Sequence, residues 1–396
     1  MMKKIFMAAF AASMSLCAMA GNEPFLTKVY DFMPAPGQFV NSIPQAVAGD
    51  TKADVLARVA EAICGRYEVE VWGDTTMVYK PSMVSLGSYG GYVVVGFDHP
   101  VVNVKGDYDF QIFGNGLYAT SLSGGSNSEP GIVMVSYDAN GNGIPDDPWY
   151  ELAGSEYNSP KTQHNYTITY YKPDENKEKT PDTNDKTIID NTYIRWTSND
   201  VNPDSISGYV GKNIFHAQSY WPQWVEGETL TFSGTKLCNN AVEMSAGSWN
   251  LFFKGWGYVD NRMDYDPIFP RKDLDTTFLN KGFKIDWAVD AEGVPVFLPM
   301  VHFIKVYTAV NQYCGRFGET SSEVGGGADF HPLAEAQQII KGDVNADGKV
   351  DVTDLTELIA HVQGSKQVGY NPVALDVNGD GCINASDVTV LIGLTM

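Results

Sequence analysis

The chain has 396 residues, enough for two domains or for one large β domain with a small appendage. It holds 27 lysines and arginines against 48 aspartates and glutamates, a formal net charge of −21. This acidic excess argues against nucleic acid and anionic membranes as partners, whereas bound cations would relieve the charge repulsion. The 39 glycines, 20 prolines and 12% aromatic residues favour a turn-rich β protein over a helical one.

The N-terminus has the pattern of a secretory signal peptide. Two lysines precede a short apolar run, which ends on Ala-Met-Ala at residues 18–20, a small-x-small cleavage pattern. The sequence therefore predicts a signal peptide over residues 1–20 and an extracellular or cell-surface mature chain. Cys17 raises the alternative of a lipid anchor, although the bulky Leu16 before it suits a lipoprotein peptidase poorly.

Four cysteines follow the predicted cleavage site, and their number is compatible with one disulfide in an oxidising compartment. Cys314 could pair with either Cys64 or Cys238, and spacing does not choose between them. The remaining cysteine is Cys382. None of these spacings resembles a zinc site.

One helix and a series of short strands are predicted in the large domain, residues 21–338. Residues 51–63 place four aliphatic side chains on one helical face. Short segments rich in β-branched and aromatic residues, separated by Gly, Asn and Asp turns, predict strands within residues 83–98, 108–114, 131–138, 166–172, 228–234 and 303–310. Without βαβ alternation, this order predicts a mainly β, jelly-roll-like sandwich. Residues 333–340 are expected to form a short helical link to a C-terminal domain, residues 341–396.

The C-terminal domain contains one acidic loop pattern written twice, 33 residues apart. Calcium takes six to eight oxygen ligands, and loop positions one, three, five, seven, nine and twelve can supply them, with glycine at six for the turn. Lys349 and Cys382 would offer their backbone carbonyls at position seven. The side-chain ligands would be Asp343, Asn345, Asp347, Asp351 and Asp354 in the first loop, and Asp376, Asn378, Asp380, Asn384 and Asp387 in the second.

Each loop runs into an apolar helical stretch, and no helix is evident before either loop. This arrangement resembles a type I dockerin over about 55 residues, which implies two calcium ions and docking onto a cohesin. Cohesin recognition in that family uses small hydroxyl residues at loop positions ten and eleven and basic residues along the helix. Here Val352 and Ala385 stand at position ten, and Ile359 and Ala360 stand where basic residues are expected. A module that caps the chain or holds another surface partner is the alternative.

A third loop of this kind lies inside the large domain, at residues 138–151. Asp138, Asn140 and Asn142 repeat the one-three-five spacing, Ile144 would give its carbonyl, and Asp146 stands at position nine. Position twelve is a tryptophan, so the closing carboxylate would come from Asp147, Glu151 or elsewhere. The alternative is an Asn-Gly hairpin turn without a metal ion.

The large domain resembles a family of secreted cell-surface proteins of gut Bacteroidetes. The stretches that carry the resemblance are residues 90–115, 128–157, 282–310 and 315–330. The family is similar to a wider set of bacterial extracellular domains that look like galactose-binding, discoidin-like jelly rolls. Proteins of this type accompany outer-membrane nutrient import systems, including those for corrinoids, so the resemblance implies a glycan or a corrinoid as the ligand.

Aromatic residues are dense at residues 217–227 and suggest a platform for a flat ligand. Tyr220, Trp221 and Trp224 fall within five positions, and Trp256 could extend the platform. Alternatively, these tryptophans fill the core between long strands.

A glycosidase needs two carboxylates that flank the scissile bond. The candidates are Asp286 and Asp290, which should project to one face, and Glu319 and Glu323. Turns, salt bridges or a bound cation would equally account for them. The sequence therefore favours a calcium-stabilised, non-catalytic protein that captures a nutrient for uptake, with a dockerin-bearing glycoside hydrolase of polysaccharide degradation as the alternative.

Overall fold

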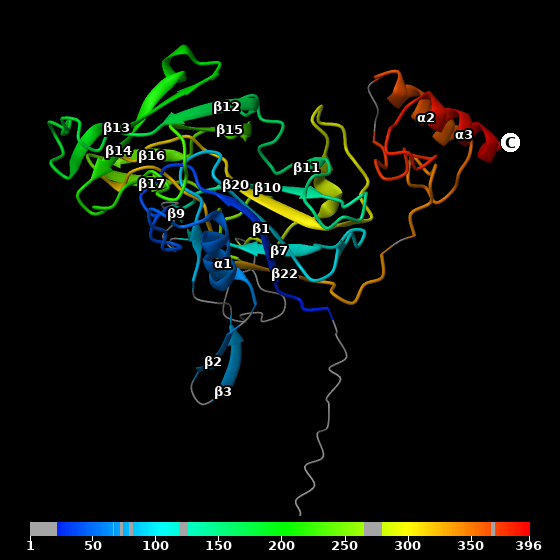
Figure 1. Ribbon diagram of the computed structural model, residues 1–396, viewed down its shortest axis with the longest axis horizontal. Coiled ribbons are helices and arrows are strands. Elements are labelled where there is room, and N and C mark those ends of the chain that lie inside the picture. The colour runs from blue at the N-terminus through cyan, green and yellow to red at the C-terminus, as the bar shows by residue number, and fades with distance from the viewer. Residues whose placement is uncertain are drawn as a thin grey trace, which may run out of the picture.

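A computed structural model describes residues 22–65, 67–71, 74–78, 82–118, 126–264, 279–336, 338–365 and 369–396. The predicted signal peptide and Cys17 lie outside these residues. The described part is mainly β, as the sequence predicts, with three α-helices and several sheets. Figure 1 shows the sheets on one side and two C-terminal helices on the other.

A six-stranded sheet forms the centre of the large domain. Its strand order is β1 (Lys28–Met33), β5 (Tyr92–Gly96), β20 (Phe303–Thr308), β10 (Gly131–Ser136), β11 (Trp149–Leu152) and β18 (Ala288–Val289). All neighbouring strands in it are antiparallel. Alternate residues of β10 face opposite sides, because Val133 and Val135 belong to one buried cluster and Ile132 to another. Both faces of this sheet are therefore covered.

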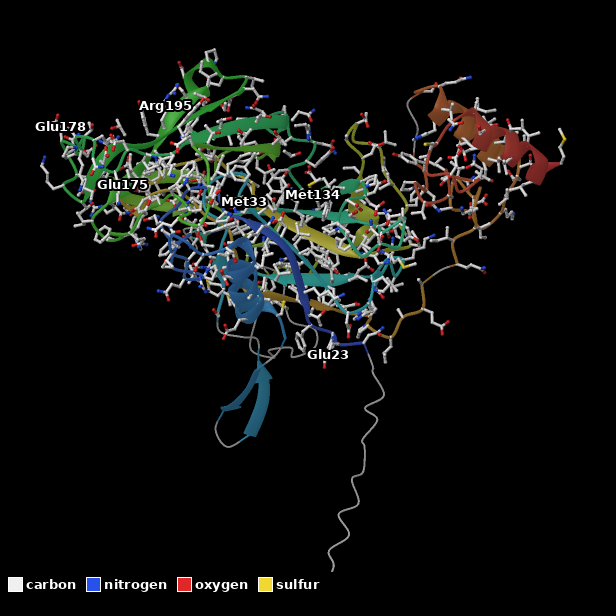
Figure 2. The ribbon with its side chains drawn as sticks, viewed as in Figure 1. Glu23, Met33, Met134, Glu175, Glu178 and Arg195 are labelled. Carbon is white, nitrogen blue, oxygen red and sulfur yellow. The ribbon has the colours of Figure 1, made fainter. Side chains whose placement is uncertain are left out.

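A four-stranded antiparallel sheet packs on one face of the central sheet. Its order is β14 (Ser207–Asn213), β13 (Ile188–Ser198), β12 (Gln163–Tyr171) and β15 (Thr229–Lys236). Tyr170 of β12 and Phe232 of β15 share a buried cluster with Ile132 and Tyr307 of the central sheet. This packing of two sheets is a β-sandwich. In Figure 2, Glu175 and Glu178 lie at the end of this layer that is farthest from the C-terminal helices.

The other face of the central sheet is covered by α1 (Lys52–Ile63) and a strand pair, β7 (Phe110–Phe113) with β22 (Gly326–Asp329). Thr51 is the N-cap of helix α1. Its hydroxyl accepts a hydrogen bond from the N–H of Asp54, and the carboxylate of Asp54 accepts one from the N–H of Thr51, an arrangement known as a capping box. Val55 and Val59 are fully buried against the sheet. The predicted helix at residues 51–63 is confirmed.

Shorter elements complete the large domain. A sheet of β16 (Ala241–Ser245), β17 (Ser248–Leu251), β9 (Ser126–Asn127) and β8 (Leu117–Tyr118) lies beside the sandwich. The strand pairs are β2 (Tyr67–Val71) with β3 (Asp74–Val78), β4 (Val84–Ser85) with β21 (Glu323–Val324), and β6 (Val101–Val102) with β19 (Met300–Val301). Short 3-10 turns are η1 (Pro203–Ser205), η3 (Ile285–Trp287) and η4 (Gly315–Phe317).

The C-terminal domain contains α2 (Val352–Val362) and α3 (Ala385–Thr395), which pack against each other. Leu358 of α2 and Leu391 of α3 are fully buried. The predicted helical link is wrong: among the described residues of 333–340, none is helical. The pattern was apolar and alanine-rich, but eight residues without a cap are too few for a stable helix. No described helix has the length and apolar character that a membrane crossing requires.

Candidate functional site

The first acidic loop, residues 343–354, is closed by hydrogen bonds from its own backbone to the predicted ligands. The N–H groups of Asp347 and Gly348 donate to the two carboxylate oxygens of Asp343, each at 3.0 Å. The N–H of Asp347 also lies 2.9 Å from Oδ1 of Asn345, and the N–H of Lys349 donates to Oδ1 of Asp347 at 3.0 Å. Gly348 has a φ of 87°, which only glycine adopts freely. The ligands at positions one, three and five are thus held in one tight turn.

The second acidic loop, residues 376–387, repeats these bonds. The N–H groups of Asp380 and Gly381 donate to the carboxylate of Asp376 at 3.1 and 3.0 Å. Oδ1 of Asn378 accepts from the N–H of Asp380 at 2.8 Å, and Oδ1 of Asp380 accepts from the N–H of Cys382 at 2.9 Å. The sequence repeat is therefore also a structural repeat.

The carboxylates at position twelve tie the end of each loop to its start. Asp354 and Asp387 are fully buried. They accept hydrogen bonds from the N–H groups of Asn345 and Asn378, at 3.2 and 3.1 Å respectively. Position nine in each loop, Asp351 or Asn384, caps the following helix. A calcium ion, which takes oxygen ligands, suits this set of carboxylates and amides.

The internal loop has the same hydrogen-bond pattern. The N–H groups of Asn142 and Gly143 donate to the carboxylate of Asp138 at 3.1 and 2.9 Å. Oδ1 of Asn140 accepts from the N–H of Asn142 at 2.9 Å, and Oδ1 of Asn142 accepts from the N–H of Ile144 at 2.7 Å. Gly143 has a φ of 72°. Four corresponding bonds thus recur in all three loops, whereas a two-residue hairpin turn would not require them.

Asp147 is one of the residues from which the closing carboxylate of the internal loop was expected. Its carboxylate accepts a hydrogen bond from the backbone of Ala139, and burial, with Asp138 and Asp146 nearby, raises its pKa. Its Oδ2 is buried and has no hydrogen-bond partner among the described residues. Glu151, the other expected residue, contacts β15 instead: its Oε2 accepts a hydrogen bond from the hydroxyl of Thr235 at 2.5 Å.

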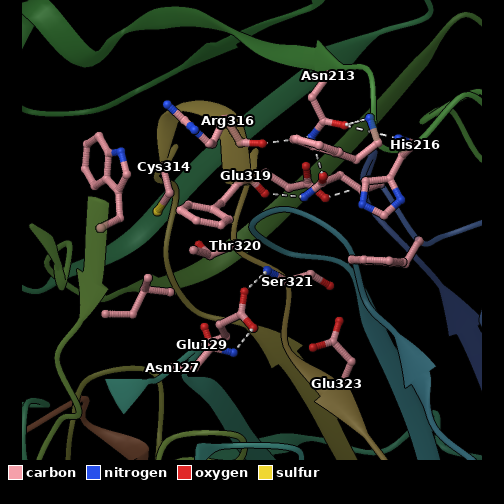
Figure 3. Close-up of a pocket in the computed structure, with 16 residues that line it drawn as sticks. Asn127, Glu129, Asn213, His216, Cys314, Arg316, Glu319, Thr320, Ser321 and Glu323 are labelled. Atoms are coloured by element: carbon pink, nitrogen blue, oxygen red, sulfur yellow. Dashed lines mark hydrogen bonds between the residues drawn. The ribbon is translucent and has the colours of Figure 1, made fainter. Parts of the chain in front are cut away.

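The large domain also contains a partly open cavity of about 510 Å³ (Figure 3). Its apolar wall includes Phe39, Phe215, Trp249, Leu251 and Phe317. Its polar side chains include Glu129, His216, Arg316, Glu319 and Glu323. An apolar wall with a few converging polar groups is typical of a small-molecule site.

A buried hydrogen-bond network positions one side of the cavity. Oε1 of Glu319 accepts from the N–H of Gln38 at 2.6 Å. The side-chain oxygen of Gln38 accepts from the amide of Asn213 at 2.7 Å, and the same amide donates to the carbonyl of Arg316 at 3.2 Å. These bonds connect three distant chain segments. On the opposite side, Oε1 of Glu129 accepts from the N–H of Ser321 at 3.2 Å (Figure 3).

The three glutamates of the cavity have raised pKa values because burial disfavours their charged forms. The pKa of Glu129 rises to about 7 and that of Glu319 to about 8. The pKa of Glu323 rises well above its usual value, through burial first and then through the charges of Glu129 and Asp260. At neutral pH the uncharged form is therefore favoured for Glu319 and Glu323, whereas Glu129 is about half ionised.

The centre of the predicted aromatic platform is buried, so that interpretation needs correction. Tyr220 is 0% and Trp221 is 3% exposed, and both belong to the core between the two sheets. Trp224 is partly buried and packs against the other core cluster. Trp256 is 50% exposed and lies 4.5 Å, between ring centres, from Trp287. Sandwich packing needs large side chains between the layers, and residues 220–221 supply them.

The candidate catalytic carboxylates fall into two groups. Glu319 and Glu323 line the cavity. Asp286 is exposed and accepts a hydrogen bond from Asn103 at 3.0 Å, while Asp290 accepts from the N–H of Val294. Asp286 and Asp290 are not among the residues that line the cavity. Asp286 therefore contacts a distant loop, while Asp290 holds the turn that ends at Val294.

No disulfide joins the four described cysteines, Cys64, Cys238, Cys314 and Cys382, so the expected pairing is not found among them. Cys314 lines the cavity, and burial raises the pKa of its thiol to about 12. A buried thiol of this kind is unreactive.

Sequence reasoning missed Glu129, Gln38 and Arg316 as cavity residues. They are far apart in the chain, in two loops and in η4, and their residue types alone do not mark them as cavity residues. Only the "GRFGETSSEV" stretch carried a signal, because it holds Glu319 and Glu323.

Residues 341–394 match the protein family described as the Dockerin type I domain. A domain of this type indicates an extracellular or cell-surface protein that is anchored through a calcium-dependent protein–protein contact. No curated protein sequence matches the chain.

Proposed function

We propose that the large domain captures a small nutrient ligand, a glycan or a corrinoid, in the 510 Å³ cavity, outside the cell. The observation that carries the proposal is the composition of the cavity wall: aromatic side chains for stacking beside buried polar groups with fixed orientation. Trp249 and Phe317 would contact the face of the ligand, and Arg316 and Glu319 would bind its polar groups. Delivery to an outer-membrane import system is the role that this binding would serve.

A glycoside hydrolase is the second candidate, and the cavity glutamates favour it. Glu319, with a pKa of about 8, could act as a general acid. The reaction also needs an ionised nucleophile or base, however, and burial raises the pKa of Glu129 and Glu323 as well. Binding without turnover is therefore the stronger candidate.

Titration calorimetry of the mature chain in calcium, against corrinoids and a glycan panel, tests the binding function. We expect saturable binding that Trp249→Ala weakens at least tenfold. Trp256→Ala is the matched control, because Trp256 is an aromatic residue outside the cavity. Release of reducing sugar that is lost in Glu319→Gln would instead establish the hydrolase, and equal affinity of the two tryptophan variants would place the ligand elsewhere.

The C-terminal domain would hold the chain on a partner, either a cohesin or another surface protein. Loop positions ten and eleven, which would contact a cohesin, are exposed in both loops: Val352 with Thr353, and Ala385 with Ser386. Val352 is 68% exposed, an apolar group that a partner could cover. Binding to a panel of immobilised cohesins, with Val352→Asp as the variant, tests the partner, and unchanged binding of that variant would exclude this face.

The three acidic loops would each bind one calcium ion, two in the C-terminal domain and one in the internal loop. The support for the third ion is the hydrogen-bond pattern that the internal loop shares with the other two loops. The paired variant Asp138→Asn and Asn140→Ala should lose one ion per chain by elemental analysis and leave the others bound. An unchanged calcium content would show that the internal loop is a metal-free turn.

A further inference from the structure

Three carboxylates from distant parts of the chain meet beside the cavity. The side-chain oxygens of Glu129, Asp260 and Glu323 lie within 4.8 Å of one another. Glu129 precedes β10, Asp260 follows a bridge to that strand, and Glu323 begins β21. Asp260 is 0% and Glu323 is 5% exposed, whereas Glu129 and Glu323 reach the cavity (Figure 3).

The backbone is arranged to hold this cluster. The N–H groups of Asn115 and Glu323 donate to the two oxygens of Asp260 at 3.0 and 2.8 Å, and the N–H of Ser321 donates to Glu129. Asp260 has a φ of 54°, a left-handed conformation that is uncommon for residues other than glycine. Strained conformations of this kind cluster at functional sites.

The charge of the cluster is not balanced by a basic side chain. In the part of the chain that the structure describes, no lysine, arginine or histidine forms an ion pair with Glu129, Asp260 or Glu323. Three carboxylates at this separation cannot all be ionised in a buried site without compensation. Either they share protons or they bind a cation.

A second observation indicates that the cavity beside the cluster holds a bound group. Oε2 of Glu319 and Oγ1 of Thr320 are buried and have no hydrogen-bond partner among the described residues. The two residues are 6% and 2% exposed, and both line the cavity. A buried polar atom without a partner is costly unless a ligand, ion or water satisfies it. Thr320 directly precedes Ser321, which contacts Glu129.

We propose that Glu129, Asp260 and Glu323 bind one divalent cation at the floor of the cavity. The ligands are all carboxylate oxygens, a set that suits calcium, whereas zinc and copper sites use imidazole or thiolate ligands as well. Three protein carboxylates leave coordination positions open, and the cavity side can fill them with water or with hydroxyl groups of the captured ligand. This role toward a ligand rests on the proposed function of the cavity, whereas the cation site itself does not.

Metal content of the full mature chain tests the site without any ligand. After dialysis against calcium, elemental analysis should find one ion fewer per chain in Glu323→Gln and in Asp260→Asn than in the unmodified protein. Glu151→Gln is the matched control, because Glu151 is a buried glutamate outside the cluster whose pKa is also raised to about 7. An unchanged calcium content in both cluster variants would overturn the proposal.

Thermal unfolding provides an independent measurement, with Glu129→Gln as a milder variant should the others fold poorly. Calcium should raise the melting temperature of the large domain, and this rise should be smaller in the cluster variants than in Glu151→Gln, because the cluster variants keep only the ion of the internal loop. If protons alone neutralise the cluster, calcium should raise the melting temperature of Glu323→Gln as much as that of the unmodified protein, which would overturn the proposal. Failure of every ligand to bind, with the calcium difference intact, would overturn only the function proposed for the cavity.

Discussion

The hydroxyl of Tyr370 donates a 2.9 Å hydrogen bond to Oδ2 of Asp290 and thereby joins the dockerin domain to the large domain. Around this bond, the N–H of Phe297 donates to the carbonyl of Tyr370 at 2.8 Å, and Val296 forms a parallel bridge to Tyr370. Side chains of the dockerin domain, such as Leu375, continue the apolar cluster of the large domain. The dockerin domain is therefore held against residues 290–297 of the large domain, in addition to being linked through the chain. Figure 1 shows its two helices beyond this contact, away from the sheets.

Replacing Tyr370 with phenylalanine should loosen this contact. A hydrogen bond to a carboxylate contributes about 1.5 kcal/mol or more, and its loss leaves Asp290 with fewer donors. Hydrogen exchange of the Phe297 N–H should become about tenfold faster. Tyr209→Phe, at an exposed tyrosine, is the control. Equal exchange rates in the two variants would show that apolar packing alone holds the domains together.

Removing calcium should unfold the dockerin domain and leave the central sheet intact. Each acidic loop places several carboxylates in one turn, so without a cation their repulsion opposes folding. The buried core of this domain is small, with Leu358 and Leu391 at its centre. Chelation with EGTA should therefore expose residues 341–394 to limited proteolysis, and added calcium should restore protection.

The paired variant Asp354→Asn and Asp387→Asn should reproduce the effect of EGTA, since it removes one carboxylate from each loop. The matched variant Asp174→Asn, at an acidic residue outside all three loops, should stay protected. Resistance of the dockerin domain to protease in EGTA would mean that its apolar contact with the large domain suffices to keep it folded.

Local patterns in the sequence predicted the local structure. The strand segments at residues 131–138 and 303–310 form β10 and β20, and the spacing of Asp343, Asn345 and Asp347 predicted a loop that the backbone hydrogen bonds bear out. These features depend on periodicity or on turn geometry within about a dozen residues.

Contacts between distant segments could not be predicted in this way. Glu129, Asp260 and Glu323 meet only because β10, the bridge at Val259 and β21 are neighbours in space. The aromatic run at residues 220–224 was equally compatible with a surface platform and with a core. The four-stranded sheet buries this run and so decides in favour of the core. Strand β13 of that sheet was not predicted from the sequence.

Trp221→Ala should destabilise the protein strongly, while Trp256→Ala should not. Trp221 is buried between the sheets, and removing a buried tryptophan costs about 3–5 kcal/mol through lost transfer energy and the cavity that remains. Trp256 is half exposed and contacts Trp287 at one side, so its loss should cost about 1 kcal/mol at most. Urea unfolding in calcium measures both. Similar midpoints for the two variants would contradict the burial of Trp221.

Glu151 should make the large domain less stable as pH rises. Burial raises its pKa to about 7 in the folded chain, compared with 4.5 for an ordinary glutamate. Between these values the folded state binds more protons than the unfolded state, so the free energy of unfolding falls with increasing pH and levels off above pH 7. A shift of this size corresponds to at most about 3 kcal/mol. Glu151→Gln should remove this loss.

Urea unfolding of Glu151→Gln and of the unmodified protein at pH 4.5 and pH 8 isolates this group, because all other titrations cancel in the difference. The variant should be more stable than the unmodified protein at pH 8 and no more stable at pH 4.5, since a glutamine resembles the protonated acid and can still bind Thr235. Glu228→Gln, whose parent side chain is 85% exposed, should show no such pH dependence. Parallel stability profiles for Glu151→Gln and the unmodified protein would mean that water or a counter-charge reaches Glu151 in solution and restores its ordinary pKa.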